Sequence, residues 1–303
     1  MQNNKTTTYR LDLKDLVLTR VRAYSQLIKM RLALLVVFSA VFGYMMAPNV
    51  VGFDLMTLVW LSLGGILVTG ASNTLNQVFE IEYDAQMTRT SKRPLVQQTV
   101  GVTEAVIFAL VCGVGGIAIL AIMFEGIVPA LLGIIALLSY AFVYTPMKRV
   151  SPLAVLIGAF PGAMPPLIGW AAATGSLEPG AWILFLIQFI WQFPHFWAIG
   201  WLQAEQYEKA GFKMLPGNTG RSKYTASLVL VYTLLLVPVG LLPYSLGMIG
   251  PITLAVLVAA GLGFSFMSFK LFRNMNPKAA LGVMFASFFY LPIIQIGMMI
   301  DKF

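Results

Sequence analysis

Long apolar stretches separated by short polar or basic connections dominate the pattern of this 303-residue chain. A helix needs about 20 residues to cross a hydrocarbon core of about 30 Å, and nine stretches approach or exceed that length. Their apolar positions are continuous rather than alternating, which favours spanning helices over barrel strands. The pattern predicts an all-α membrane protein of about nine transmembrane helices, near 30–48, 55–77, 104–124, 127–144, 152–173, 180–201, 226–247, 250–272 and 280–300.

The composition agrees with a membrane protein. Apolar residues make up 58% of the chain and charged residues 11%, whereas soluble proteins carry about 25% charged residues. The mean hydropathy is +0.82. One cysteine and one histidine exclude a disulfide framework and a multi-histidine metal site.

The basic residues predict the orientation of the chain in the membrane. All 20 Lys and Arg residues except Lys302 fall in the N-terminal segment or in every second connection. The positive-inside rule therefore predicts a cytoplasmic N-terminus and a C-terminus outside. The same bias explains the net charge of +8 as an orientation signal and a contact with anionic membrane lipids, with no role in nucleic-acid binding.

Residues 1–28 are predicted to form a cytoplasmic amphipathic segment, and residues 29–303 a single transmembrane domain. Within 9–28, apolar residues recur at near-helical spacing between charges: Leu11, Leu16, Leu18, Val21 and Leu27. This spacing fits a helix lying along the membrane interface. A solvated tail with a helical bias fits it as well.

Acidic residues gather at the cytoplasmic end of the second predicted span. Asn76, Glu80 and Asp84 stand at i, i+4 and i+8, so a helix places them in a stripe about 12 Å long. Stacked carboxylates repel each other, and hard oxygen ligands at a helix end suit Mg²⁺ bridged to a substrate diphosphate. Basic residues that could contact phosphate oxygens follow at once: Arg89, Lys92 and Arg93. The alternative is a helix end with internal ion pairs among Glu80, Asp84, Arg89 and Lys92.

At these residues the chain resembles the UbiA-type membrane prenyltransferases, and among them the protoheme IX farnesyltransferases (haem O synthases). The first family motif, N-x-x-x-D-x-D-x-D, is similar to Asn76–Asp84, with glutamates at positions 80 and 82. Further similar segments are Met87–Leu95, Tyr144–Arg149, Gly162–Ala171, Trp191–Ala198 and Ala210–Pro216. The resemblance covers roughly residues 24–295.

The resemblance implies a UbiA-type bundle in the bacterial inner membrane that transfers a farnesyl group from farnesyl diphosphate to a vinyl group of haem B. It implies Mg²⁺ on the catalytic residues Asn76, Glu80, Asp84 and Glu205. Further substrate contacts are implied at Arg89, Lys92, Arg93, Lys148, Arg149 and Tyr207. The family commonly has an Asp-Asp pair before this tyrosine, but here Glu205 is the only acid of the pair, so the second acidic site is weakened. A haem A synthase or a terminal oxidase is a possible partner.

His195 lies within the sixth predicted span among aromatic residues that include Trp191 and Trp197. An ionisable residue inside a membrane is a candidate functional residue, and neutral imidazole commonly binds haem iron. The three side chains are therefore expected to contact haem. The alternative is a histidine that bonds a neighbouring helix, with the aromatic residues as core.

Two other functions remain open from the sequence. A prenyltransferase of the same fold could act on a quinone precursor or another tetrapyrrole. A secondary transporter also buries charges in a helical bundle, but its coupling residues lie near the midplane, whereas these acids are predicted at one membrane face.

Overall fold

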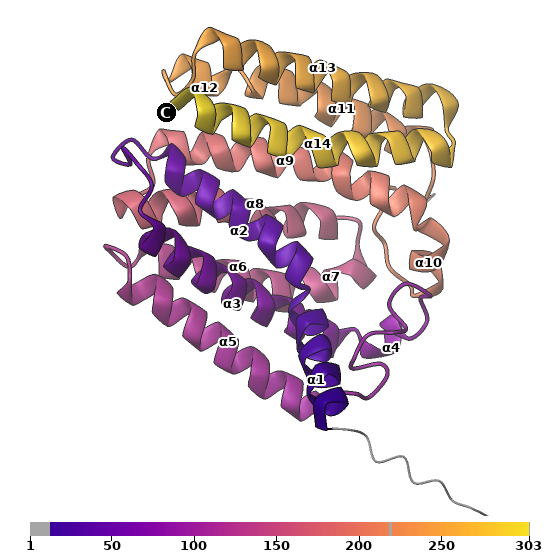
Figure 1. Ribbon diagram of the computed structural model, residues 1–303. Helices are drawn as coiled ribbons and strands as arrows, with labels where there is room; N and C mark the ends of the chain where they lie inside the picture. The colour runs from indigo at the N-terminus through magenta and orange to yellow at the C-terminus, as the bar shows by residue number, and fades with distance from the viewer. Residues whose placement is uncertain (1–12, 218–219, 303) are drawn as a thin grey trace, which may run out of the picture.

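The computed structural model describes residues 13–217 and 220–302, which contain helices and no strand (Figure 1). In chain order the elements are α1 (Leu13–Ile28), α2 (Met30–Met46), α3 (Leu55–Phe79), α4 (Ile81–Asp84), α5 (Val102–Ile122), α6 (Val128–Leu138), the π-helical turn η1 (Ser139–Tyr144), α7 (Thr145–Val150), α8 (Ala154–Thr174), α9 (Pro179–Leu202), α10 (Ala204–Lys209), α11 (Lys223–Val239), α12 (Leu242–Ser245), α13 (Pro251–Asn274) and α14 (Pro277–Lys302).

The predicted spans are confirmed. In the described part of the chain, eight helices are long and apolar enough to cross a membrane, with α6, η1 and α7 joined as one span and α11 and α12 as another. Counted together as one span bent by 48°, α1 and α2 would give a ninth. Which end of the bundle faces the cytoplasm stays a prediction from the charge bias.

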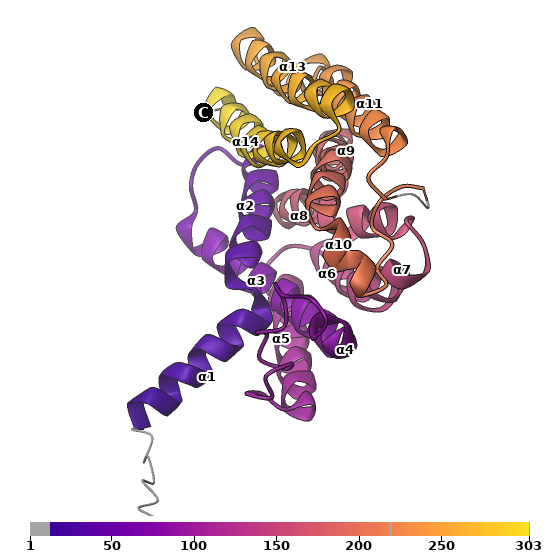
Figure 2. The same cartoon turned by 90° about the vertical axis from the view of Figure 1, so that its right-hand side faces the viewer.

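The first helix, α1, leaves the bundle at an angle (Figure 2). The bend lies at Lys29, whose backbone has the left-handed φ of 52°. Two side chains of α3 bond the carbonyls that end α1: Asn73 Nδ2 donates to Ile28 O at 3.0 Å and Gln77 Nε2 to Leu27 O at 2.8 Å. These bonds satisfy groups that a helix end leaves free, so the end of α1 is fixed beside the acidic stripe.

The described part of the predicted amphipathic segment is helical from Leu13 to Ile28, and Leu11 lies outside the described residues. Leu27 is buried, whereas Leu16, Leu18 and Val21 are about half exposed. Exposed apolar side chains on a helix are compatible with a position at the membrane surface.

The central helix α8 packs against α2, α6 and α9. Glycines allow α2 and α8 to approach closely: a Cβ on Gly169 would lie 1.8 Å from Ala40 O, and one on Gly43 would lie 2.1 Å from Pro166 O.

Within α8, Pro166 has no N–H to donate to the carbonyl of Gly162 one turn earlier. That carbonyl instead accepts a 2.9 Å bond from Gln188 Nε2 of α9, so a side chain compensates for the proline inside the membrane.

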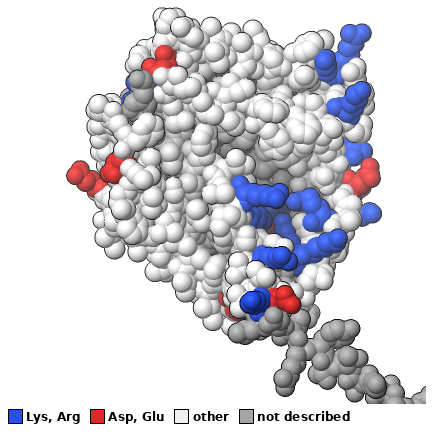
Figure 3. Space-filling model, viewed as in Figure 1, with Lys and Arg blue, Asp and Glu red and all other residues white. Residues whose placement is uncertain are grey.

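The outer face of the bundle is apolar. On α5 the side chains of Ile107, Leu110, Val111 and Val114 are 56–69% exposed. Such a surface is stable only against lipid or another apolar partner. Lys and Arg side chains gather instead toward one end of the spans, with several around a hollow near α7 (Figure 3).

Candidate active site

The acidic stripe lies where α3 gives way to α4. The two helices meet at Glu80, whose φ of −109° and ψ of 10° are not helical. The bond from Asp84 N to Glu80 O, 2.8 Å long, keeps the helical i, i+4 relation across this break. Asn76, Glu80 and Asp84 are therefore all buried, with at most 4% exposure, while Glu82 is exposed.

Cations from three separate segments contact the three buried residues. Lys148 Nζ of α7 lies 2.8 Å from Glu80 Oε1, and Arg93 pairs with Asp84 Oδ2. Lys29 Nζ, from the bend between α1 and α2, donates to Asn76 Oδ1 at 3.2 Å. The tertiary structure thus places one basic side chain against each of the three residues.

The amide of Asn76 has a defined orientation. Thr145 Oγ1 donates to Tyr140 O at 2.9 Å and accepts from Asn76 Nδ2 at 3.1 Å. The amide nitrogen is therefore held by η1 and α7, and the Asn76 oxygen faces the cluster. Single-turn π-helical segments such as η1 are frequent at functional sites.

Asp84 has an unsatisfied oxygen. Its Oδ1 is buried without a hydrogen-bond partner, while Oδ2 pairs with Arg93. Burial raises the pKa of this carboxyl above its usual value, and the nearby Arg93 guanidinium opposes that shift. A buried carboxylate with a free oxygen is suited to a cation as a further partner.

Two predicted basic residues do not join the cluster. Arg89 and Lys92 are exposed, and neither forms an ion pair with another described residue. The alternative that Glu80 and Asp84 pair with Arg89 and Lys92 is therefore wrong about which cations take part. The local sequence does not reveal which distant segments pack against the end of a helix. The cations in contact are Lys148 and Arg93.

Arg149 and Tyr207 lie at the rim of the cluster. Arg149 donates to Tyr83 Oη at 2.6 Å, and its guanidinium lies 4.6 Å from the Tyr83 ring centre. The ring of Tyr207 meets Phe212 edge-on at 6.2 Å, and Phe212 in turn lies 5.8 Å from Tyr83. These contacts join the segment after α9 to α4 and α7.

Glu205 stands apart from the stripe in its contacts. Its side chain is 77% exposed and pairs with Arg221 at 3.1 Å. The neighbouring Gln206 Oε1 accepts from Thr88 N at 2.9 Å, which places α10 beside the loop after α4. Among the described residues no three His, Cys, Asp or Glu side chains are grouped closely enough to hold a metal ion. The oxygen ligands of the cluster are two carboxylates and the Asn76 amide.

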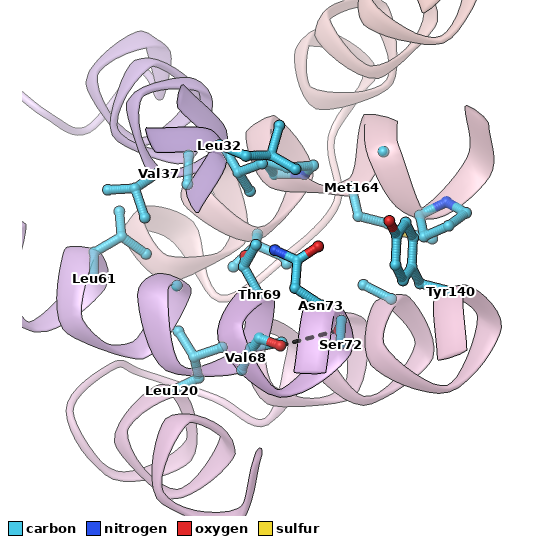
Figure 4. A pocket seen from close by; sticks show the side chains of 18 residues that line it. Leu32, Val37, Leu61, Val68, Thr69, Ser72, Asn73, Leu120, Tyr140 and Met164 are labelled. Carbon is cyan, nitrogen blue, oxygen red and sulfur yellow. Dashed lines mark hydrogen bonds between the residues drawn. The ribbon is translucent and has the colours of Figure 1, made fainter. Parts of the chain in front are cut away.

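An apolar cavity of about 120 Å³ extends from this region into the bundle (Figure 4). Its lining includes Asn73 at one end of α3 and Leu61 twelve residues earlier, a helical distance of about 18 Å. The remaining lining comes mainly from α2, α3 and α8, with Tyr140 of η1. Asn73 stands one turn from Asn76, so the cavity ends about one helical turn from the first residue of the acidic stripe.

The aromatic residues of α9 divide between two faces. The ring of Trp191 stacks on His195 with centres 4.7 Å apart, and His195 Nδ1 lies 2.8 Å from Ser287 Oγ of α14. Trp197 lies two residues further, about 200° around the helix, and packs edge-on against Tyr232 of α11 at 5.1 Å. The predicted set is therefore split: Trp191 and His195 lie together, and Trp197 points elsewhere.

Sequence reasoning missed four residues that shape these sites: Lys29, Tyr83, Thr145 and Ser287. The sequence indicates Lys29 only as an orientation charge. Its position directly before an apolar span could have indicated a functional role, because a lysine there lies at the membrane boundary. The other three are ordinary polar residues whose partners lie on distant segments.

The comparisons with known proteins place the chain in a family. The model of the UbiA prenyltransferase family matches residues 36–291. The chain therefore belongs to the UbiA prenyltransferase family and is a multi-pass membrane protein. The similarity predicted from the motifs is thereby confirmed.

Close relatives carry a more particular name. A protoheme IX farnesyltransferase from Cytophaga hutchinsonii is 46% identical over 94% of this chain and 99% of the relative. Another from Christiangramia forsetii is 42% identical over 92% and 93%. Both relatives are bacterial.

Solved structures support the same fold. A digeranylgeranylglyceryl phosphate synthase matches with a TM-score of 0.78 at 20% identity, over 93% of this chain and 98% of that one. A UbiA homologue from Archaeoglobus fulgidus bound to GPP and Mg²⁺ matches with a TM-score of 0.66 at 17% identity, over 91% and 99%. At such identities the likeness concerns the fold alone.

Proposed function

We propose that this protein transfers the farnesyl group of farnesyl diphosphate to a vinyl group of haem B to make haem O. The observation that carries the proposal is the buried cluster of oxygen ligands and cations beside an apolar cavity. The names of the relatives, protoheme IX farnesyltransferase, support the acceptor and the donor.

The cluster fits a magnesium ion. Asn76, Glu80 and Asp84 supply hard oxygens, and Asp84 Oδ1 is buried without a partner. Mg²⁺ is commonly held by one or two carboxylates together with substrate phosphates. When bound, the ion would neutralise charge that builds up on the departing diphosphate. Glu205, which is exposed and paired with Arg221, is proposed as a further ligand of the metal.

The cations of the chain have a complementary role. Lys29, Arg93 and Lys148 already contact the oxygen ligands and would donate to phosphate oxygens. Arg89 and Lys92, which follow the stripe along the chain, and Arg149, next to Lys148, are exposed and would add donors once a diphosphate is present. Positive charge fixed before reaction stabilises the leaving diphosphate as the allylic C–O bond breaks.

The acceptor completes the reaction. As the C–O bond breaks, its electron pair leaves with diphosphate and the farnesyl carbon becomes cationic. The vinyl π-bond attacks that carbon and forms the new C–C bond. Water then adds to the remaining cationic carbon and loses a proton, which gives a hydroxyethyl group. The apolar lining of the cavity excludes water from the first cation, and Trp191 and His195 are the proposed haem contacts.

Product analysis tests the proposal directly. Purified protein in lipid nanodiscs is given haem B, farnesyl diphosphate and Mg²⁺, and the porphyrin products are identified by mass spectrometry. We expect haem O to form. Prenylation of an aromatic acid instead of haem B would support a quinone-precursor enzyme, and absence of any diphosphate release would contradict the enzyme class.

Removal of divalent metal is expected to stop turnover. A chelator in excess should suppress haem O formation, and added Mg²⁺ should restore it, because the ion that Asp84 and Glu80 would hold would no longer neutralise the diphosphate. The haem absorption spectrum of the same sample serves as the control and should not change. Continued turnover in the chelator would contradict a metal at Asn76, Glu80 and Asp84.

Filling the apolar cavity is expected to select against long donors. Thr69 lines the cavity, so a phenylalanine at this position should displace part of the farnesyl chain. We expect Thr69→Phe to raise KM for farnesyl diphosphate about tenfold, which is the loss expected when methylene contacts in an apolar pocket are removed. Dimethylallyl diphosphate, with one isoprene unit, should be affected less. The near-isosteric Thr69→Val is the control. An equal loss for both donors would place the farnesyl chain elsewhere.

A further inference from the structure

Ser287 of α14 joins the histidine and the tryptophan of α9. The serine is completely buried. Its Oγ lies 2.6 Å from Met284 O on its own helix and 2.8 Å from His195 Nδ1. Its backbone oxygen accepts a 2.9 Å bond from Trp191 Nε1. One residue of α14 therefore contacts both members of the stacked pair.

The two contacts of the Ser287 hydroxyl determine where its single proton lies. A carbonyl oxygen can only accept, so the 2.6 Å contact with Met284 O requires the hydroxyl to donate to it. The hydroxyl has no second proton and meets His195 Nδ1 with a lone pair. The histidine must therefore donate from Nδ1, and in the neutral ring the Nε2 atom holds the lone pair.

The Nε2 atom remains available to a ligand. Among the described residues Nε2 has no hydrogen-bond partner. The atom is not fully buried, so it remains accessible. The half-buried ring is held on one face by Trp191 and at its edges by Phe196 and Phe288, with centres 5.5 and 5.2 Å away. A fixed imidazole with an open lone pair is a typical ligand for haem iron.

We propose that Ser287 is a positioning residue for haem, because it holds His195 in the tautomer that directs the Nε2 lone pair at the acceptor substrate. The inference rests on the proposed function, in which His195 contacts haem. Bonds of this kind, in which the second ring nitrogen donates to a fixed acceptor, orient metal-binding histidines generally. Ser287 touches neither diphosphate nor haem and acts through His195.

Replacement of the hydroxyl tests this role. We expect Ser287→Ala to raise the Kd for haem B about tenfold, within the range seen when such supporting bonds are removed. The KM for farnesyl diphosphate should stay unchanged. Ser287→Thr keeps a hydroxyl and should restore haem binding. The bond from Trp191 goes to the Ser287 backbone, so all these variants retain it.

A matched control is available on α13. Ser268 is equally buried, and its Oγ donates to Phe264 O at 3.1 Å and forms no hydrogen bond with another described side chain. Ser268→Ala removes a buried hydroxyl of the same kind and should leave haem binding unchanged. If Ser287→Ala failed to fold, Ser287→Cys would replace it, because a thiol is a weak acceptor and predicts the same loss.

The measurement is a titration of the full-length protein in nanodiscs with haem B, followed through the haem absorption band, together with separate KM values for the two substrates. In a double-mutant cycle, Ser287→Ala should add nothing to His195→Ala, because the serine acts through the histidine.

The possible results distinguish the positioning role of Ser287 from the haem contact of His195 and from the proposed function. A wild-type titration by Ser287→Ala, or an additive loss in the double variant, would overturn the positioning role while His195 kept its place. An unchanged haem spectrum in His195→Ala would overturn both the haem contact and the inference. Failure of the wild type to make haem O would contradict the proposed function itself.

Discussion

Asp84→Asn is expected to reduce turnover by about 10²–10³-fold, the loss typical when one charge-stabilising group is removed from an active site. The substitution keeps the shape of the side chain and removes its charge. Asp84 is buried, holds Arg93 with one oxygen and has no partner for the other. The neutral amide would bind a cation weakly, so diphosphate release should slow. Haem O formation and diphosphate release, measured together, check this result.

Glu82→Gln is the matched control for Asp84. It removes the same charge two residues away, but Glu82 is exposed and its side chain has no ion pair with another described residue. Turnover should stay within about twofold of wild type, as for surface changes outside a site. Equal losses in both variants would indicate that total negative charge matters, and normal turnover in Asp84→Asn would contradict the metal assignment.

Lys148→Met is expected to lower the stability of the protein by about 3–5 kcal/mol, the usual cost of leaving one buried charge without its partner. The Lys148 and Glu80 side chains are only 10% and 6% exposed, and their charged atoms are 2.8 Å apart. Glu80 would remain buried without this counter-charge. The thermal unfolding midpoint in detergent, without substrates, measures the effect. Arg149→Met is the control, since Arg149 is exposed and its loss should cost at most about 1 kcal/mol.

A second substitution separates stability from chemistry. Glu80→Gln combined with Lys148→Met removes both charges, so the unfolding midpoint should recover toward the wild-type value. Turnover should stay low, because the double variant lacks one oxygen ligand and one phosphate donor. Recovery of turnover together with stability would show that the pair is only a structural ion pair.

The sequence predicted the acidic stripe because all three of its members lie on one stretch of backbone. Asn76, Glu80 and Asp84 repeat every four residues, and the i, i+4 bond between Glu80 and Asp84 keeps this relation although the helix breaks at Glu80. The periodicity therefore survives a change in helix axis. The cationic partners could not be predicted in the same way, since Lys148 is 68 residues from Glu80 along the chain.

The aromatic residues of α9 show the same limit. The sequence grouped Trp191, His195 and Trp197, but helical geometry turns Trp197 to the opposite face, where it meets Tyr232. The choice of His195 tautomer depends on Ser287, which is 92 residues away and carries no sequence signal of its own. A single hydroxyl becomes informative only when its two partners are known.

The sequence by itself determined the apolar spans, their helical nature and the helix face that carries the acids, because hydrophobic length and helical period are properties of continuous segments. The tertiary structure decided which cations meet the acids, how the Asn76 amide is turned and where the apolar cavity lies. These features depend on contacts between segments far apart in the chain, and such contacts follow from the packing of whole helices rather than from any local pattern.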